Sequence, residues 1–368
     1  MRALMAGGGT GGHIYPAIAI AEKIMRRQPD SEILFVGAEQ GMEKDIVPSH
    51  GFSIRFIRVR GFSRSNMIKN IGVAADLLRA AGEARAILRE FGPDVVIGTG
   101  GYVSGPVVRE AGRAGIRAFI HEQNAYPGLA NRMAERYAEK VFLAFEDGKR
   151  YFRSKEKAVV TGNPVRAGFA ASALGEYREK LGIGPHEFVV LCFGGSRGAR
   201  KINESMAAIM KRLCGDGGVR LFFITGDAYY DSCAAALEEA GMRNGESALV
   251  MRYTGRMHEY LSSADLVISR GGALAISEIC ACGKAAILIP SPNVTGNHQH
   301  YNAKTVADRG GAMLMDDAGL TPDSLLAAIL RLKNNRPLVN AMGEASGRLG
   351  RVDAADVIYR HIAGEPSA

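Results

Sequence analysis

The sequence contains no tryptophan, only five cysteines, and no apolar stretch long enough to cross a bilayer. A membrane-spanning helix needs about 18 or more predominantly apolar residues in a row. The odd number of cysteines and the lack of a Cys-x-x-Cys pair argue against a disulfide framework, so reduced, buried thiols are expected. A glycine-rich segment begins at Gly7, which leaves no room for the apolar core of a signal peptide. We therefore expect a cytoplasmic protein.

The aromatic and histidine residues argue against two further kinds of binding, to nucleic acid and to a metal ion. Aromatic residues make up only 7% of the chain and no nucleic-acid-binding module is recognisable, which argues against a nucleic-acid partner. His298 and His300 form a His-x-His pair, but no third ligand is evident nearby, so no metal site is expected. The length of 368 residues predicts two domains rather than one.

Acidic residues are absent from Ile46 to Ala75, although the whole chain contains 38 of them. The same stretch interleaves apolar residues, such as Phe56 and Ile68, with basic ones: Arg55, Arg58, Arg60, Arg64 and Lys69. Two interpretations stay open, a solvated basic face over core residues and a surface that lies on anionic lipid. The net charge of +8 also favours an anionic partner, such as a nucleotide, a diphosphate or a membrane.

The most informative segment that is present is Gly7–His13, which reads GGGTGGH. The apolar residues Ala3–Ala6 before it predict a buried strand, and Tyr15–Gln28 after it predicts a helix with Pro16 in the first turn. Glycines let backbone N–H groups approach a ligand, and a helix N-terminus adds partial positive charge, so the unit is typical of an anion site. A tight turn without a ligand is the alternative. His13 stands where the loop becomes helix.

Strand-like and helix-like segments alternate through the first half of the chain. Strands are predicted at Glu32–Gly37, Ser53–Val59, Pro93–Gly98, Arg117–Ile120, Lys140–Ala144 and Ala158–Val160, and a helix from Ala74 to Phe91. This order predicts βαβ units and a parallel sheet, whose binding sites lie beyond the carboxyl ends of the strands. A glycine-rich turn at Thr99–Pro106 and the polar segment His121–Asn124 join Gly7–His13 at that edge.

The pattern starts again after Thr161–Arg166, which we interpret as a linker. The strand Phe188–Phe193 leads into the glycine-rich loop Gly194–Arg200 and a helix through Leu213, and further strands are predicted at Leu221–Thr225, Leu249–Arg252, Leu266–Ser269 and Ala285–Ile289. The sequence thus predicts an α/β protein of two doubly wound domains, residues 1–163 and 164–368, with a cleft between their carboxyl edges.

Three segments of the second half are candidates for binding. Gly194–Gly198 offers backbone N–H groups for an anion, with the hydroxyl of Ser196 beside them, and is no Walker A loop because Gly-Lys-Ser/Thr is missing. Glu278 lies in the helix after Ser269–Gly272, where its carboxylate could accept two hydrogen bonds from a ribose diol or simply face solvent. Asn297–Ala303 groups amides and imidazoles suited to sugar hydroxyls, or begins an ordinary polar helix.

Seven segments together resemble the MurG family, the undecaprenyldiphospho-muramoylpentapeptide β-N-acetylglucosaminyltransferases. They are GGGTGGH at 7–13, GTGGYVSGP at 98–106, HEQNAYPGLANR at 121–132, TGNPVR at 161–166, GGSRGAR at 194–200, SRGGALAISEI at 269–279 and NHQHYNA at 297–303. Each segment alone is modest, but the ordered set spans nearly the whole chain and is specific.

The resemblance implies a GT-B fold, two Rossmann-like parallel-sheet domains facing across a cleft. The domain at 1–163 would face the acceptor and the membrane, that at 164–368 would bind UDP-GlcNAc, and the C-terminal helix would pack back on the first. The implied reaction is an inverting transfer of GlcNAc from UDP-GlcNAc to the 4-hydroxyl of lipid I, giving lipid II in peptidoglycan synthesis. It implies no cofactor and no metal, a peripheral position on the cytoplasmic side of the cell membrane, and cell-wall synthesis proteins as possible partners.

The resemblance also assigns roles to residues. The donor would contact Ser196 through its diphosphate, Glu278 through its ribose, Gln299 through GlcNAc, and the nucleotide-lining residues Ala273, Leu274, Ala275, Ile276 and Ser277. Thr10, Gly11, Gly12, Asn124 and Arg166 would complete the donor site. Tyr253–Gly255 departs from the Phe-Ile-Asp-like stretch that contacts uracil in many relatives, which leaves Thr254 without an assignment.

The catalytic base is expected to be His13, because an imidazole with a pKa near about 6.5 suits proton transfer at neutral pH. Glu122 is the alternative base, and His13 could instead orient the acceptor.

Other functions fit parts of the sequence. Gly7, Gly9 and Gly12 with Glu39 match an NAD-dependent oxidoreductase, but one dinucleotide site leaves the second glycine-rich loop and Glu278 unexplained. Another GT-B enzyme with a different UDP-sugar, and a non-enzymatic basic membrane or nucleic-acid binder, are the remaining alternatives.

Overall fold

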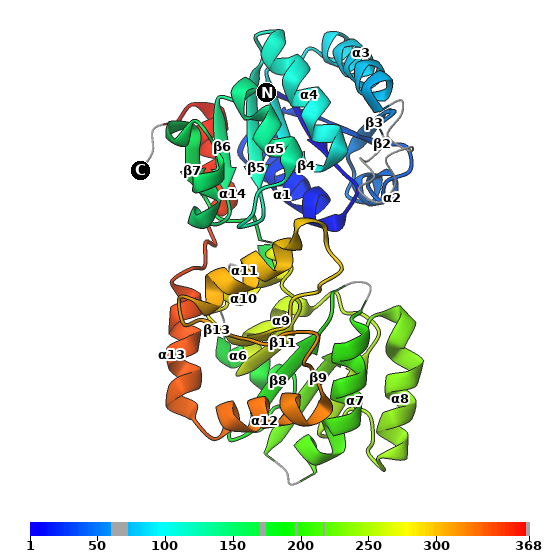
Figure 1. Ribbon diagram of the computed structural model, residues 1–368, viewed down its shortest axis with the longest axis vertical. Coiled ribbons are helices and arrows are strands. Elements are labelled where there is room, and N and C mark those ends of the chain that lie inside the picture. The colour runs from blue at the N-terminus through cyan, green and yellow to red at the C-terminus, as the bar shows by residue number, and fades with distance from the viewer. Residues whose placement is uncertain (60–72, 166, 170–173, 196–197, 216–217, 366–368) are drawn as a thin grey trace. The chain divides into compact units, whose positions relative to one another are not determined.

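The computed structural model describes residues 1–59, 73–165, 167–169, 174–195, 198–215 and 218–365 (Figure 1). The chain divides into two compact units, one made of Met1–Val165 with Val352–Ala368 and the other of Arg166–Arg351. The division predicted between residues 163 and 164 lies two residues earlier than this one. We describe each unit by itself.

The first unit is built on a parallel sheet of seven strands in the order β3-β2-β1-β4-β5-β6-β7. The strands are β1 Arg2–Gly7, β2 Glu32–Ala38, β3 Ser53–Ile57, β4 Val95–Gly100, β5 Arg117–Glu122, β6 Lys140–Leu143 and β7 Ala158–Val160. Strand order reverses between β1 and β4, so the chain leaves these two neighbours in opposite directions along the sheet. Such a switch point is where open parallel sheets bind ligands.

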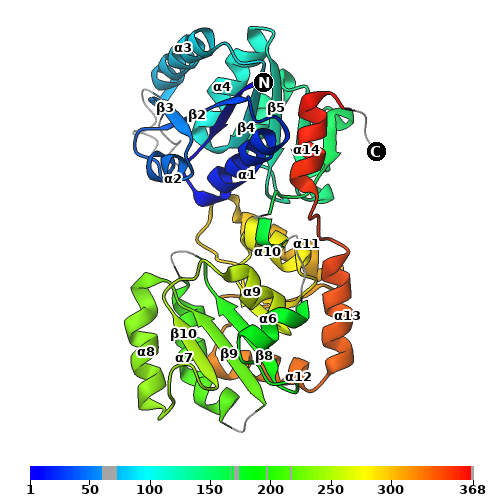
Figure 2. The ribbon, with the colours of Figure 1, turned by 180° about the vertical axis from the view of Figure 1, so that it is seen from behind.

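Helices cover both faces of this sheet, as the two views in Figures 1 and 2 show. They are α1 Gly11–Arg27, α2 Glu43–Ser49, α3 Val73–Phe91, α4 Gly101–Arg113, α5 Leu129–Ala134 and α14 Ala354–Ala363. Alternate residues of β1 point to opposite faces: Ala3 and Met5 pack with α1 and α14, while Leu4 and Ala6 pack with α3 and α4. A strand buried on both faces has to be apolar throughout, which explains its sequence.

Several predicted strand ends in this unit differ from the structure by one or two residues, and two predictions were wrong by more. Helix α1 begins at Gly11 instead of Tyr15, and α4 begins at Gly101, so most of the segment predicted as a turn at Thr99–Pro106 is helical. Gly100 has a φ of 108° and reverses the chain directly from strand to helix. A turn of several residues is therefore unnecessary.

The C-terminal helix α14 packs on α1 of the first unit. Lys23 Nζ lies 2.7 Å from Asp356 Oδ2, and Gln28 Nε2 donates to the hydroxyl of Tyr359 at 2.9 Å. Apolar side chains of α14, among them Ile358 and Ile362, join the core between α1 and the sheet.

The second unit has a parallel sheet of six strands in the order β10-β9-β8-β11-β12-β13. The strands are β8 Phe188–Phe193, β9 Val219–Ile224, β10 Ala248–Met251, β11 Leu266–Ser269, β12 Ala285–Leu288 and β13 Ala312–Leu314. The last, only three residues long, was not predicted. Its helices are α6 Leu174–Lys180, α7 Arg200–Cys214, α8 Tyr230–Glu239, α9 Met257–Ser263, α10 Ala273–Ala281, α11 His298–Ala307, α12 Pro322–Lys333 and α13 Arg336–Gly347.

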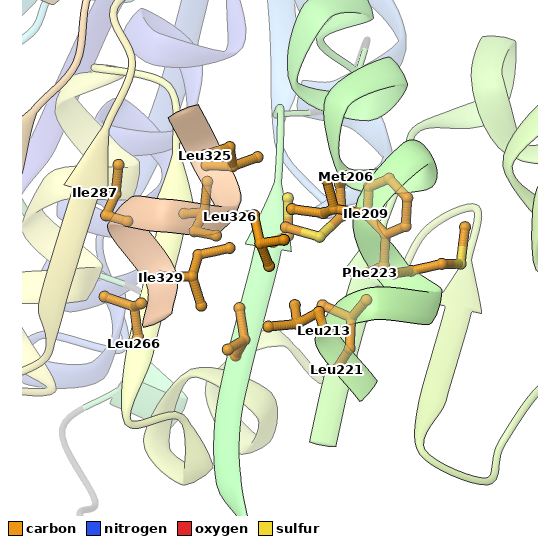
Figure 3. Close-up of a cluster of buried hydrophobic side chains, with 14 of the residues drawn as sticks. Met206, Ile209, Leu213, Leu221, Phe223, Leu266, Ile287, Leu325, Leu326 and Ile329 are labelled. Carbon is orange, nitrogen blue, oxygen red and sulfur yellow. The ribbon is translucent and has the colours of Figure 1, made fainter. Parts of the chain in front are cut away.

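Helices α7 and α12 form the apolar core on one face of this sheet (Figure 3). Met206, Ile209 and Leu213 recur at helical spacing along α7, and Leu325 and Ile329 do so along α12. This core fixes the sheet, and so the carboxyl ends of β8, β11 and β12, which carry the candidate donor-binding segments. Among the described residues, no helix is both long and apolar enough to span a membrane.

Candidate active site

The first glycine-rich loop, Gly7–Thr10, is braced from below by a buried carboxylate. Glu43 of α2 is completely buried and accepts hydrogen bonds from the backbone N–H groups of Gly9 at 2.9 Å and Ala38 at 2.8 Å. A Cβ on Gly8 would lie 2.1 Å from Oε1 of Glu43, so this glycine makes room for the carboxylate. The N–H of Gly9 therefore points into the protein and is not available to an anion.

The anion-binding capacity of this loop lies instead at the start of α1. Thr10 is the N-cap residue, and Gly11 and Gly12 form the first turn of the helix, where backbone N–H groups lack helical acceptors. Thr10 and Gly12 are exposed and Gly11 is partly exposed. These three predicted donor-site residues thus lie together at the positive end of a helix dipole.

His13 is held against the ends of β4 and β5. Its Nδ1 lies 3.1 Å from the carbonyl oxygen of Thr99 and 3.0 Å from Oε1 of Gln123, and the Thr99 hydroxyl donates to the carbonyl of His13 at 2.8 Å. A Cβ on Gly100 would lie 2.7 Å from Nδ1, so only glycine at this position lets the ring approach the strand. The ring is partly exposed and fixed in direction.

Glu122 is buried and fully engaged in holding the loop after β5. Its Oε1 accepts from the backbone N–H and the side-chain amide of Asn124, at 3.0 and 3.1 Å. Its Oε2 accepts from the backbone N–H of Gly128 at 3.0 Å and from Nδ2 of Asn131 at 2.8 Å. Asn124, predicted to contact the donor, is partly exposed and positioned by this carboxylate.

His121 of β5 is completely buried, and its ring faces the segment after β7. Burial lowers the pKa of its imidazole to about 4, against the opposing effect of a hydrogen bond to the carbonyl of Gly162 and with a smaller contribution from nearby His13. The side chain is therefore neutral at physiological pH.

In the second unit, the loop after β8 packs tightly on the neighbouring strand. Gly198 has a φ of 72°, and a Cβ there would lie 2.3 Å from the carbonyl oxygen of Thr225 at the end of β9. Ser196 and Arg197 of this loop, like Arg166 of the predicted linker, lie outside the described residues, so their predicted roles stay predictions.

The segment between β11 and α10 is held by Arg270, which is turned inward. Its guanidinium pairs with Asp317 and donates to the carbonyl of Ile289 at 3.0 Å. A Cβ on Gly271 would lie 2.2 Å from the carbonyl oxygen of Gln299, so α11 packs directly on this turn. The quoted segment SRGGALAISEI includes Arg270 but gave it no role, and Asp317 was not singled out, because no local pattern links residues so far apart.

Helix α10 divides the predicted nucleotide-lining residues between two faces. Ala273 and Ile276 are buried, whereas Leu274, Ala275, Ser277 and Glu278 are partly exposed. The Ser277 hydroxyl donates to the carbonyl of Ala273 at 2.9 Å. The partly exposed face, with Glu278 one and a half turns into the helix, is the one that can meet a ligand.

Gln299 and its neighbours form a strained turn at the start of α11. Asn297 has a φ of 52° and is the one non-glycine with positive φ in the described parts of the chain. Oε1 of Gln299 accepts from the backbone N–H of Ser291 at 2.9 Å, which closes the loop after β12. Such strain is frequent at ligand sites. Within the described ranges, no three metal-ligating side chains cluster.

Comparisons with known proteins decide the family. Residues 3–143 match the glycosyltransferase family 28 N-terminal domain and residues 189–358 match the glycosyltransferase family 28 C-terminal domain. The chain is 41% identical over 364 residues (98% of this chain, 88% of the relative) to the UDP-N-acetylglucosamine–N-acetylmuramyl-(pentapeptide) pyrophosphoryl-undecaprenol N-acetylglucosamine transferase of Clostridioides difficile. It is 44% identical to that of Desulforudis audaxviator, over 97% of this chain and 96% of the relative.

Solved structures agree. The crystal structure of Acinetobacter baumannii MurG matches with a TM-score of 0.80 and 27% identity, over 99% of both chains. The chain belongs to the MurG family. The UDP-GlcNAc 2-epimerase of Neisseria meningitidis, at 13% identity and a TM-score of 0.65 over 99% of this chain and all of that one, shares the fold alone.

For this MurG-family chain, the predicted GT-B fold of two Rossmann-like parallel sheets is confirmed, and so is the prediction of a glycosyltransferase. The NAD-dependent oxidoreductase is not supported, because both matched domains are those of glycosyltransferases. Glu39, the acid invoked for that alternative, lies 3.8 Å from Arg58. Glu43 was not singled out in the sequence, and Gln123 and Arg270 lie in quoted segments but received no role there, because their contacts are with distant segments.

Proposed function

We propose that this chain transfers GlcNAc from UDP-GlcNAc to the 4-hydroxyl of the muramoyl sugar of lipid I, forming lipid II. The observation that carries the proposal is the similarity to named N-acetylglucosamine transferases over 97–98% of the chain. An α-linked donor and a β-1,4 product require inversion, and so a single displacement. The acceptor oxygen attacks C1 of GlcNAc, its proton passes to a base, and the bond to the diphosphate breaks with the electron pair on UDP.

His13 is the base in this proposal. Its ring is partly exposed and fixed by Thr99 and Gln123, whereas both oxygens of Glu122 already accept two hydrogen bonds each. Protonating Glu122 would break a hydrogen bond from one of the N–H donors that hold the Asn124 loop, so the contacts favour His13. The start of α1, with Gly11 and Gly12, would hold a phosphate of the acceptor or donor close to it.

The donor would lie at the carboxyl ends of β8, β11 and β12. Glu278 would accept from the ribose hydroxyls, the amide of Gln299 would contact GlcNAc, and the loop around Ser196 would hold the diphosphate. Backbone N–H groups at the N-terminus of α7 and the guanidinium of Arg166 would stabilise the negative charge of the leaving UDP.

The first unit would also bind the membrane that carries lipid I, from the cytoplasmic side. Leu77 and Leu78 near the start of α3 are 44% and 71% exposed, and Asp76 separates them from the stretch that lacks acids. Two large apolar side chains in water beside basic residues suit a surface that dips below anionic head groups.

The transfer itself is tested with purified protein, UDP-GlcNAc and a soluble lipid I analogue. We expect UDP release with formation of a β-1,4-linked GlcNAc product, and little turnover with UDP-GalNAc. Turnover of UDP-GlcNAc onto water or another acceptor only, with the analogue untouched, would refute the proposal.

The base is tested by His13→Ala. We expect turnover to fall by about 10²-fold or more, the usual contribution of general acid–base catalysis, with little change in the affinity for UDP-GlcNAc. His186→Ala, at an exposed histidine of the second unit, is the matched control and should keep wild-type turnover. Full activity of His13→Ala would exclude the base role.

A further inference from the structure

Three side chains at the carboxyl ends of β4 and β5 form one hydrogen-bonded row. Nδ1 of His13 lies 3.0 Å from Oε1 of Gln123, and Nε2 of Gln123 lies 3.0 Å from Nδ1 of His121. At the far end, Nε2 of His121 lies 3.1 Å from the carbonyl oxygen of Gly162. The carbonyl oxygens along this row can only accept hydrogen bonds, and they determine which nitrogen donates in each bond.

The amide of Gln123 has one possible orientation. Its Nε2 lies 2.8 Å from the carbonyl oxygen of Thr99 and 3.1 Å from that of His121. A carbonyl oxygen can only accept, so the NH₂ end must face both of them, and the reversed amide would bring oxygen against oxygen. Oε1 therefore faces His13 as an acceptor.

His121 is consistent with this direction. Its Nε2 must carry a hydrogen because Gly162 offers only a carbonyl oxygen. In the neutral ring Nδ1 is then an acceptor, and it shares the second hydrogen of the Gln123 amide with the carbonyl oxygen of His121. Burial keeps the pKa of this histidine at about 4, so the ring is neutral at physiological pH.

At the near end of the row, Nδ1 of His13 faces two acceptors, the Thr99 carbonyl oxygen at 3.1 Å and Oε1 of Gln123 at 3.0 Å. Neither can donate, so Nδ1 must carry the hydrogen. A neutral imidazole has one N–H, and the lone pair of His13 is therefore on Nε2.

We propose that Gln123 is a positioning residue that holds neutral His13 in the Nδ1–H tautomer, so that Nε2 is the nitrogen that accepts a proton. This inference rests on the proposed function where it assigns the proton: it moves from the acceptor hydroxyl to Nε2 as the new C1–O bond forms and the bond to UDP breaks. The resulting imidazolium keeps its Nδ1–H bonds to Thr99 and Gln123, whose oxygens stabilise the new positive charge.

The tautomer is measured directly by NMR on the full-length protein with ¹⁵N-labelled histidine, with His13 assigned from the spectrum of His13→Ala. In the neutral ring of His13, we expect the hydrogen on Nδ1 and none on Nε2. In Gln123→Met, a side chain of similar size without the amide, we expect a mixture of tautomers and a kcat lowered by about tenfold, with unchanged UDP-GlcNAc affinity. This fall is smaller than the loss of about 10²-fold expected when the base itself is removed. Gln28→Met, which removes an amide bonded to Tyr359, is the matched control.

Two results would overturn the positioning role: a wild-type spectrum with the hydrogen on Nε2, or a Gln123→Met protein with wild-type tautomer and wild-type kcat. The wild-type spectrum decides even if Gln123→Met fails to fold. Failure of the proposed function looks different, because the wild-type protein would then leave the lipid I analogue untouched, whatever tautomer its His13 shows.

Discussion

Single residues in this protein act mainly by deciding which polar groups remain available. Glu43 and Glu122 are both buried and both occupied by N–H donors of the chain, so neither offers a free oxygen to a substrate. Gly100 has no side chain, which lets the ring of His13 approach to hydrogen-bond distance of Thr99. In the proposed function, proton transfer therefore depends on the imidazole of His13 and on the residues that orient it.

Burial of His121 makes the stability of the first unit depend on pH. The folded pKa of about 4 lies below the ordinary 6.5, so between these values the unfolded chain binds a proton that the folded chain does not. The free energy of unfolding is therefore highest above about pH 6.5 and falls as pH drops towards 4, by up to about 3 kcal/mol from this group. Urea unfolding across this range measures it.

The contribution of His121 is isolated by comparison with His121→Leu, which should show a shallower loss of stability with falling pH. His186→Leu, at an exposed histidine, should keep the wild-type slope. If the free energy of unfolding fell equally with pH in wild type and His121→Leu, the predicted contribution of the buried His121 would be wrong.

Glu278→Ala tests the assignment of the donor ribose. Loss of a charged acceptor should weaken UDP-GlcNAc binding by about 1–3 kcal/mol, as measured by calorimetric titration. Glu238→Ala removes an exposed acid from α8 of the same unit and should leave the affinity unchanged. Equal affinities for both variants would mean that Glu278 does not meet the ribose.

At the scale of elements, two strand-to-helix turns that are far apart in the sequence pack on each other. A Cβ on Gly101 at the start of α4 would lie 2.4 Å from the carbonyl oxygen of Gly8, and one on Gly7 would lie 2.0 Å from the hydroxyl of Thr99. Gly7 and Gly101 are thus needed for the close packing of the two turns. Helix α2 completes the arrangement, because its Glu43 holds the first turn from behind.

Glu43→Gln tests the brace beneath the first glycine-rich loop. One oxygen becomes an NH₂ group facing a backbone N–H donor, so we expect the free energy of unfolding to fall by about 1–3 kcal/mol. Chemical denaturation measures this, and transfer activity should fall with it because the loop leads into α1 and His13. Asp45→Asn, an exposed acid on the same helix, should change neither quantity. Wild-type stability of Glu43→Gln would show that the carboxylate is dispensable.

At the scale of the whole molecule, folding changes the meaning of the charge pattern. The stretch without acids is neutralised in part by acids from elsewhere: Arg55 pairs with Glu90 of α3 at 2.6 Å, and Arg58 lies 3.9 Å from Glu83. Among the five basic residues, the other three, Arg60, Arg64 and Lys69, lie outside the described residues. They are the cations on which membrane binding would depend.

Vesicle binding tests this surface. Each cation near an anionic leaflet contributes about 1 kcal/mol, weakened by salt, and the exposed leucines of α3 would add a part that salt does not affect. Replacing Arg60, Arg64 and Lys69 by Glu should release the protein from anionic vesicles in co-sedimentation but spare UDP-GlcNAc binding. A second triple variant, with Glu at Lys211, Arg243 and Arg331 of the second unit, carries the same charge change and should stay bound. Equal loss of vesicle binding in both triple variants would show that only the net charge of the protein matters.

The sequence alone determined the family, the parallel-sheet architecture and the segments at the strand ends, because short apolar runs, glycine-rich turns and their order are local properties of the chain. Only the tertiary structure decided the starts of α1 and α4, the inward face of α10 and the partners of Glu122 and Glu43. Helix α10 is apolar on nearly all sides, so its pattern leaves its rotation undetermined. The bonds that orient His13 join positions 86 and 110 residues apart. Contacts over such separations depend on packing of the whole sheet, which no local pattern records.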